Sequence, residues 1–205
     1  RIQVSLFNIL QEGDIQIRGF KLRLPLDIQF VFTANPEDYT NRGSIVTPLK
    51  DRIESQILTH YPKDIVTSKE ITLQEAQLSD SQKKNVTGHE LIENLLEQIA
   101  FEARSNEFVD PKSGVSARLT ISAYETIFSA AERRMIINGE SKTHIRISDF
   151  WGIIPSITGK IELVYEGEQE GAMIVAQNLI SKSIRFQFKN YFPDPEKLKR
   201  KKEAN

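Results

Sequence analysis

Apolar residues recur at steps of three and four over much of the second half of the chain. The spacing is regular over residues 91–103 and again over 117–135, and it is looser over 172–191. Such spacing places apolar side chains along one face of an α-helix. We therefore predict three long helices whose apolar faces form a shared core, because a stripe of this kind is typical of packing rather than of a cofactor site.

The first part of the chain has a different pattern. Short alternating segments at 14–17 and 22–24 flank a turn that contains a glycine, which predicts a β-hairpin. A continuous apolar run within 27–34 indicates a strand that is covered on both faces, as in a parallel sheet. A short helix over about 47–54 and a strand near 56–60 are predicted to follow. The order strand, loop, helix, strand is the α/β pattern.

Two connecting segments are also interpreted. Residues 62–84 are polar and predict a helix that bridges or packs loosely. Residues 144–147 are predicted to form a short strand or extended link before a helix capped by Ser148. At the start of the chain, residues 1–10 have helical spacing without a preceding capping residue, so we expect a helix entered part-way and a chain that is the carboxy-terminal part of a longer polypeptide.

These patterns predict a domain boundary near residue 62. Residues 1–62 are expected to form an α/β region, and residues 63–192 a helical domain. Residues 193–205 are expected to form a basic, disordered tail, because prolines end the last helix and a run of lysines follows.

Composition narrows the possible partners and compartment. At 205 residues the chain can hold one large domain or two small ones, and its net charge of -1 argues against extensive nucleic-acid or membrane binding. The absence of cysteine excludes disulfides, thiolate zinc sites and a cysteine nucleophile. There is neither an apolar run of roughly 18 residues, as a membrane span needs, nor a signal-peptide profile. We expect a cytoplasmic protein.

Several common catalytic motifs are missing. The stretch 152–161 resembles a phosphate-binding loop, but its glycine spacing is wrong and an isoleucine stands where the hydroxyl residue belongs. The histidines His60, His89 and His144 are far apart in the sequence. The segment His89–Glu93 has glutamate where a zinc-protease helix has its second histidine, and no G-x-S-x-G motif occurs. Neither a metal site nor a serine hydrolase is indicated.

Asn35 is the first candidate site residue. It follows the predicted buried strand, and in open α/β sheets ligands gather beyond the carboxyl ends of the strands. An amide at that point can orient a water molecule without carrying charge. The alternative is that Asn35 and Pro36 simply begin a turn.

Arg52 is the second candidate. Its forked, permanent charge suits stabilisation of a phosphoryl group during transfer. The alternative is a surface ion pair with Asp51 or Glu54, worth at most about 1 kcal/mol.

Arg118 is the third candidate, in the first turn of the helix predicted from residue 117. A cation there opposes the helix dipole at a cost of roughly 0.3–1 kcal/mol, which a bound phosphate would offset. Aliphatic packing or a glutamate partner would also explain it.

Taken in order, four segments resemble the second half of an AAA+ ATPase module of the kind found in magnesium chelatase ATPase subunits and MoxR-type ATPases. Residues 4–13 resemble the helix after the Walker B acidic pair, and residues 32–37 resemble the sensor-1 strand. Residues 48–52 resemble the arginine-finger helix, and residues 114–118 resemble the sensor-2 turn. Ala117 departs from the family, in which proline is frequent at that position.

The resemblance implies an α/β remnant followed by an all-α lid, that is, the second half of a P-loop nucleotide domain and the helical lid domain. It makes Asn35 the sensor-1 residue, Arg52 the arginine finger and Arg118 the sensor-2 residue, with Arg42 as a second basic residue that leaves the finger assignment open. The complete protein would use ATP and Mg²⁺, and would form a homo-oligomeric ring of six subunits. The Walker motifs precede this region in the family, so the chain alone is expected to be inactive.

The implied activity is ATP hydrolysis coupled to remodelling of a partner protein or a chelatase complex; the substrate, and whether magnesium chelation occurs, stay open. A rival interpretation is a non-enzymatic helical module in which residues 63–192 bind another protein. A nucleic-acid module is disfavoured, because the short basic tail is its main support and no basic, aromatic-studded pair of strands occurs.

Overall fold

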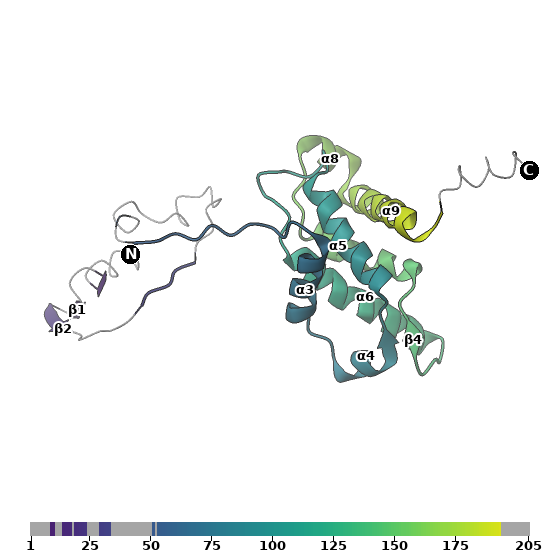
Figure 1. Cartoon of the computed structure of the whole chain (residues 1–205), viewed down its shortest axis with the longest axis horizontal. Coiled ribbons are helices and arrows are strands. Elements are labelled where there is room, and N and C mark those ends of the chain that lie inside the picture. Colours follow the sequence, from purple (N-terminus) through teal and green to yellow (C-terminus); the bar gives the residue numbers. More distant parts are fainter. Residues whose placement is uncertain are drawn as a thin grey trace, which may run out of the picture. The chain divides into compact units, whose positions relative to one another are not determined.

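The computed structural model describes residues 9–10, 14–17, 19–23, 29–33, 51 and 53–193 (Figure 1). The chain divides into two compact units, Arg1–His60 and Tyr61–Asn205. Three residues named in the sequence analysis, Asn35, Arg42 and Arg52, lie outside the described residues, as does the predicted tail beyond residue 193.

The first unit contains the predicted hairpin. Strand β1 (Asp14–Ile17) pairs antiparallel with β2 (Phe20–Arg23), with Ile15 opposite Leu22. Gly19 lies in the connecting turn at φ 89°, a left-handed conformation that glycine adopts without a steric penalty. The hairpin is confirmed, although its second strand begins at Phe20 rather than Leu22.

The two other strands predicted in this unit are not found among its described residues. Residues 29–33 and 53–60 have no regular secondary structure. Val31 is 81% exposed and Ile57 is 89% exposed. The prediction that the apolar run within 27–34 is a strand covered on both faces is therefore wrong for the described residues 29–33. A buried parallel strand needs neighbouring strands to pair with and helices to cover it. Among the described residues of this unit, only the hairpin strands are paired.

The second unit is mostly helical, with a small parallel sheet (Figure 1). Its elements in chain order are α3 (Ile65–Glu75), α4 (Asp80–Asn85), β3 (Val86–Thr87), α5 (Glu90–Arg104), α6 (Arg118–Ile137), β4 (Thr143–His144), the 3₁₀-helix η1 (Ile147–Ile153), α7 (Ile154–Thr158), α8 (Tyr165–Glu170) and α9 (Ala172–Tyr191). Strands β3 and β4 pair in parallel, with Val86 opposite Thr143. The small sheet therefore joins segments that lie on either side of α5 and α6 in the sequence.

Helix α5 packs against α3, α6 and α9. Its predicted apolar stripe is buried, with Leu95, Leu96 and Ile99 at most 2% exposed. The α6 stripe is buried as well, and Leu119 and Ile127 are fully covered. The three long helices are thus confirmed, as are the packing faces of α5 and α6.

The far end of α9 departs from the prediction. Phe186 and Tyr191 are about half exposed, whereas the polar residues Ser183 and Gln187 are buried. The Gln187 amide donates to the Gln98 side-chain oxygen of α5 at 3.4 Å. The inward face of this helix end is therefore polar, and the prediction that its aromatic residues form core is wrong.

The segment 62–84 forms two helices rather than one. Asp64 caps α3 by accepting from the Thr67 amide at 2.8 Å. Ser79 caps α4 through a capping box with Gln82. Helix α3 is not loosely packed, because its Ser68 and Thr72 are buried.

The predicted Ser148 cap is also wrong. The 3₁₀-helix begins at Ile147, and the Asp149 carboxylate accepts from the Arg146 amide at 2.8 Å. The side chain that bonds the backbone at this helix start is therefore the Asp149 carboxylate and not the Ser148 hydroxyl. Over the ranges described, no helix has the length and apolar content that crossing a bilayer requires.

Candidate functional site

Arg118 lies in the first turn of α6, as the sequence predicts; it is the first residue of the helix, and its side chain is exposed. The residue before it, Ala117, gives no side-chain cap, and the first turn contains no acidic residue. Among the described residues, no carboxylate pairs with the Arg118 guanidinium. The alternative of a glutamate partner therefore gains no support in the part of the chain that can be seen.

The turn that leads into α6 is shaped by Asp110 and Gly114. The Asp110 carboxylate accepts from the Lys112 amide at 2.8 Å, and the Ser113 hydroxyl contacts it. Gly114 has φ 68°, and a Cβ there would collide with the hydroxyl oxygen of Tyr61. Glycine is required at this position both for its backbone angle and for the close approach of the tyrosine.

The same turn is held from below by Arg104 of α5. The Arg104 Nε donates to the Val115 carbonyl at 3.3 Å. The guanidinium lies over two aromatic rings, 4.5 Å from the Tyr61 centroid and 5.3 Å from that of Phe101. Burial lowers the pKa of Arg104, although the positive charge is retained at neutral pH.

A chain of hydroxyl groups reaches the same turn from another side. The Thr120 hydroxyl donates to the Ala117 carbonyl at 3.0 Å and lies 2.8 Å from the Thr72 hydroxyl. Thr72 in turn lies 2.6 Å from Oε1 of Glu97, a side chain that is buried with 1% exposure. Burial raises the pKa of the Glu97 carboxyl.

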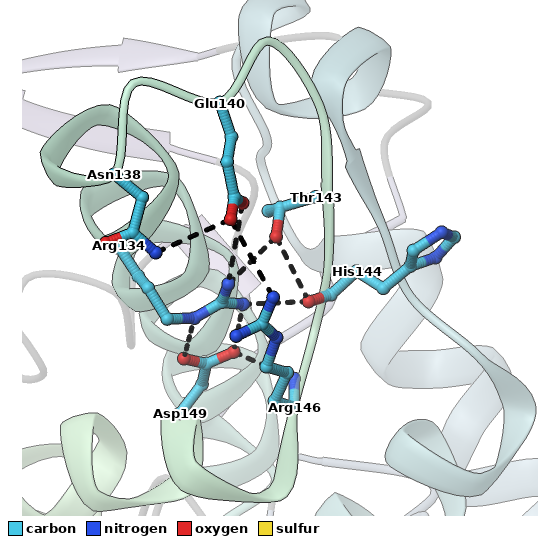
Figure 2. A network of polar contacts seen from close by, with 7 residues as sticks. All are labelled: Arg134, Asn138, Glu140, Thr143, His144, Arg146 and Asp149. Carbon is cyan, nitrogen blue, oxygen red and sulfur yellow. Dashed lines mark hydrogen bonds and ion pairs between the residues drawn. The ribbon is translucent and has the colours of Figure 1, made fainter.

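The other end of α6 carries a second arginine with a different environment (Figure 2). The Arg134 Nε and Nη2 both donate to the Asp149 carboxylate at 2.9 Å. Its Nη1 donates to the Thr143 hydroxyl at 2.9 Å, and Nη2 also donates to the His144 carbonyl at 2.8 Å. All three nitrogens of the guanidinium are used to join β4 and η1 to α6.

The charges in this network stabilise each other. Burial alone would raise the pKa of Asp149, but the hydrogen bonds from Arg134 and from the Arg146 amide hold it below its usual value. The bond to Asp149 raises the pKa of Arg134. Sequence reasoning missed this pair, because no local spacing links a residue of α6 with one beyond β4.

A pocket of about 270 Å³ lies between the second half of α6 and η1, lined by residues that include Ala130, Arg133 and Gly152. It falls just below the range of about 300–1,000 Å³ that is usual for small-molecule sites. Arg118 does not line it.

Two of the three histidines come together, although they are far apart in the sequence. The rings of His89 and His144 stack at 5.1 Å, both exposed, because β3 and β4 pair side by side. Within the described ranges, no group of three or more histidine or acidic side chains could hold a metal ion.

The stretch that resembles a phosphate-binding loop folds as the end of η1 and helix α7, with Pro155 in the first turn. It is not a glycine-rich loop.

Of the three candidate residues, only Arg118 can be located. The convergence of Asn35, Arg52 and Arg118 on one ligand stays a prediction, because the first two lie outside the described residues. Comparison of the chain with protein-family models, with curated proteins and with solved structures gave no match.

Proposed function

We propose that this chain carries the sensor-1, arginine-finger and sensor-2 elements of an AAA+ ATPase of the magnesium chelatase or MoxR type. In this proposal residues 63–192, within the second unit, are the helical lid. The activity is hydrolysis of ATP with Mg²⁺, coupled to remodelling of a partner protein or a chelatase complex. The 205 residues contain no phosphate-binding loop, so the activity requires one from elsewhere in the assembly.

The supporting observation is the environment of Arg118. Its exposed guanidinium stands at the start of a 20-residue helix, where the helix dipole already attracts anions. Without an anion, a cation in the first turn is unfavourable by roughly 0.3–1 kcal/mol. A nucleotide phosphate bound beside Arg118 would interact favourably both with the guanidinium and with the helix dipole, and so offset this cost.

The three candidate residues have distinct roles in the proposal. Arg118 binds the terminal phosphate of the nucleotide and so couples closure of the lid to ATP hydrolysis. Asn35 orients the attacking water. Arg52, or alternatively Arg42, reaches the nucleotide of a neighbouring subunit, which requires a homo-oligomeric ring, six-membered by analogy with the family. We expect the complete protein to work in the cytoplasm.

ATP hydrolysis by the protein expressed from its complete reading frame tests the proposal. Arg118→Ala is expected to lower kcat by about 100-fold, the usual effect of removing one preorganised group that stabilises transition-state charge. Arg133→Ala is the matched control, because Arg133 is an exposed arginine of the same helix near its other end. The proposal fails if both variants hydrolyse ATP at the wild-type rate.

A second candidate function is the non-enzymatic helical interaction module. It is favoured by the exposed aromatic pair at the end of α9, where Phe188 and Phe192 stack at 4.5 Å while remaining 44% and 51% exposed. Under this alternative, Phe188→Ser would abolish binding of a partner protein and Arg118→Ala would have no effect on activity.

A further inference from the structure

Two charged side chains on the core side of α5 lie beneath the turn that precedes Arg118. Glu97 and Arg104 are about two helical turns apart, so they point in similar directions. Glu97 is 1% exposed, and the Nη1 and Nη2 atoms of Arg104 are buried. A buried charged group lowers stability unless its partners compensate for the lost hydration. The presence of two such groups beneath this turn suggests that they have a role there.

Arg104 is not explained by stability alone. Its Nη1 and Nη2 have no hydrogen-bond partner among the described residues, and each buried, unpaired donor costs about 1–3 kcal/mol. An unbranched apolar side chain could fill the same space without this cost. What the arginine adds is the bond from Nε to the Val115 carbonyl and the stacking on Tyr61.

Tyr61 contacts both this arginine and the turn that precedes α6. Its ring covers the guanidinium of Arg104, and its hydroxyl oxygen fills the space that a Cβ at Gly114 would occupy. Tyr61 is the first residue of the second unit. The backbone from Gly114 to Val115 is therefore enclosed between a tyrosine and an arginine.

Glu97 controls the other side of the turn through two threonines. The Thr120 hydroxyl has a single proton, which goes to the Ala117 carbonyl because a carbonyl can only accept. The proton between Thr120 and Thr72 must then come from Thr72. The contact from Thr72 to Oε1 of Glu97 is then a third simultaneous hydrogen bond if the carboxyl supplies the proton, whereas a charged carboxylate would accept from Thr72 at the expense of the bond between Thr72 and Thr120.

The hydrogen-bond chain thus runs from a protonated Glu97 through Thr72 and Thr120 to the Ala117 carbonyl. Oε2 of Glu97 is left free to accept from the Ser68 hydroxyl, which lies 2.5 Å away. The burial of the carboxyl favours the same protonation state. Every member of this network is satisfied in that arrangement, so it can fix the backbone geometry at the start of α6.

We infer that Arg104 and Glu97 are positioning residues for Arg118, because they fix the carbonyls of Val115 and Ala117, two of the three peptide groups that precede it. The inference rests on the proposed function, since the position of Arg118 affects activity only if Arg118 has a ligand. A displacement of about 1 Å at a reacting centre can lower the rate by about 100-fold.

Steady-state ATP hydrolysis by the complete protein measures the effect on activity. Arg104→Met and Glu97→Leu are expected to lower kcat by about 10-fold or more with little change in KM, as misplacement of a catalytic group predicts. Glu97→Gln is the conservative control, because an amide can donate to Thr72 and accept from Ser68 as the protonated carboxyl does; it should retain wild-type kcat. In the double variant Arg104→Met with Arg118→Ala, kcat should be no lower than in Arg118→Ala alone.

Amide hydrogen exchange in the same proteins measures positioning without reference to ATP. The amides of Arg118, Leu119 and Ile121 should exchange at least about 10-fold faster in Arg104→Met and Glu97→Leu than in wild type, and at the wild-type rate in Glu97→Gln. Unchanged exchange in the first two variants would overturn the inference whatever the ATPase result. Faster exchange together with an Arg118→Ala protein of wild-type activity would uphold the positioning role and reject the proposed function instead.

Discussion

Helix α6 carries one arginine at each end, and the two have opposite environments. Arg134 donates from all three guanidinium nitrogens, to Asp149, Thr143 and the His144 carbonyl (Figure 2). Arg118 is exposed and has no carboxylate partner among the described residues. The same residue type on the same helix is thus bound within the fold at one end and available to a ligand at the other.

The difference separates stability from function. A guanidinium whose nitrogens all donate within the fold is not available to a ligand. Its removal leaves a buried carboxylate without a counter-charge, which destabilises the fold. A guanidinium that extends from a helix start into solvent contributes little to the fold. Its position is nevertheless well defined, because the turn before it is held by Arg104 and by the hydroxyl chain from Glu97.

The largest expected stability effect comes from Arg134→Ala. Removing one partner of a buried ion pair costs about 3–5 kcal/mol, and because Arg134 is only part-buried we expect the lower end of this range. Arg118→Ala removes a cation that opposes the helix dipole, so the free energy of unfolding should stay the same or rise by up to about 1 kcal/mol. Urea unfolding followed by the fluorescence of Trp151, the single tryptophan, reports on η1 beside Asp149. Equal losses in the two variants would remove the contrast between the two ends of α6.

Gly114→Ala should have the next largest effect. A non-glycine residue at φ 68° costs roughly 1–3 kcal/mol, and the new Cβ also meets the Tyr61 hydroxyl oxygen. Combining it with Tyr61→Phe removes the steric part and leaves the backbone strain, so the double variant should recover part of the lost stability. If the double variant recovers no free energy of unfolding in urea, the clash with the Tyr61 hydroxyl is not part of the loss.

Glu97→Gln should have the smallest effect, and one that depends on pH. Because the folded-state pKa of Glu97 is raised, the folded protein holds the proton more tightly than the unfolded chain, and the stability that this provides is lost as pH rises from 4.5 through the folded pKa. Glutamine does not titrate, so the variant should match wild type near pH 4 and become more stable than wild type as pH rises. The charged groups close to Glu97 are Arg104 of α5 and Lys69 of α3.

Urea unfolding of both proteins at several pH values measures this difference. A variant that is less stable than wild type at neutral pH would mean that the carboxylate is charged and needed as such.

The sequence predicted the elements whose residues carry a local period. Leu95 and Ile99 lie four residues apart on one helical face, and the helix and its buried side follow from that spacing. The hairpin was predicted because its turn glycine and alternating flanks are also local signals. The start of α6, and with it the position of Arg118, came from the same kind of reasoning.

Features that depend on distant partners could not be predicted in this way. An apolar run such as that around Val31 is compatible with a buried strand, but only the surrounding structure decides whether anything covers it. The aromatic residues near the end of α9 fit a helical stripe, yet Gln187 faces α5 instead. The bonds of Arg134 to Asp149, and of Glu97 to Thr72, join separate elements and leave no periodic trace in the sequence.

The role of Arg118 is tested most directly by thermal unfolding of the complete protein with and without Mg²⁺ and a non-hydrolysable ATP analogue. We expect Arg118→Ala to have the wild-type Tm or a slightly higher one without nucleotide, and a clearly smaller rise in Tm when the analogue is added, because a ligand stabilises the fold only as far as its affinity allows. A variant whose Tm falls without nucleotide, but rises with it as much as wild type, would show that Arg118 serves the fold and not a bound phosphate.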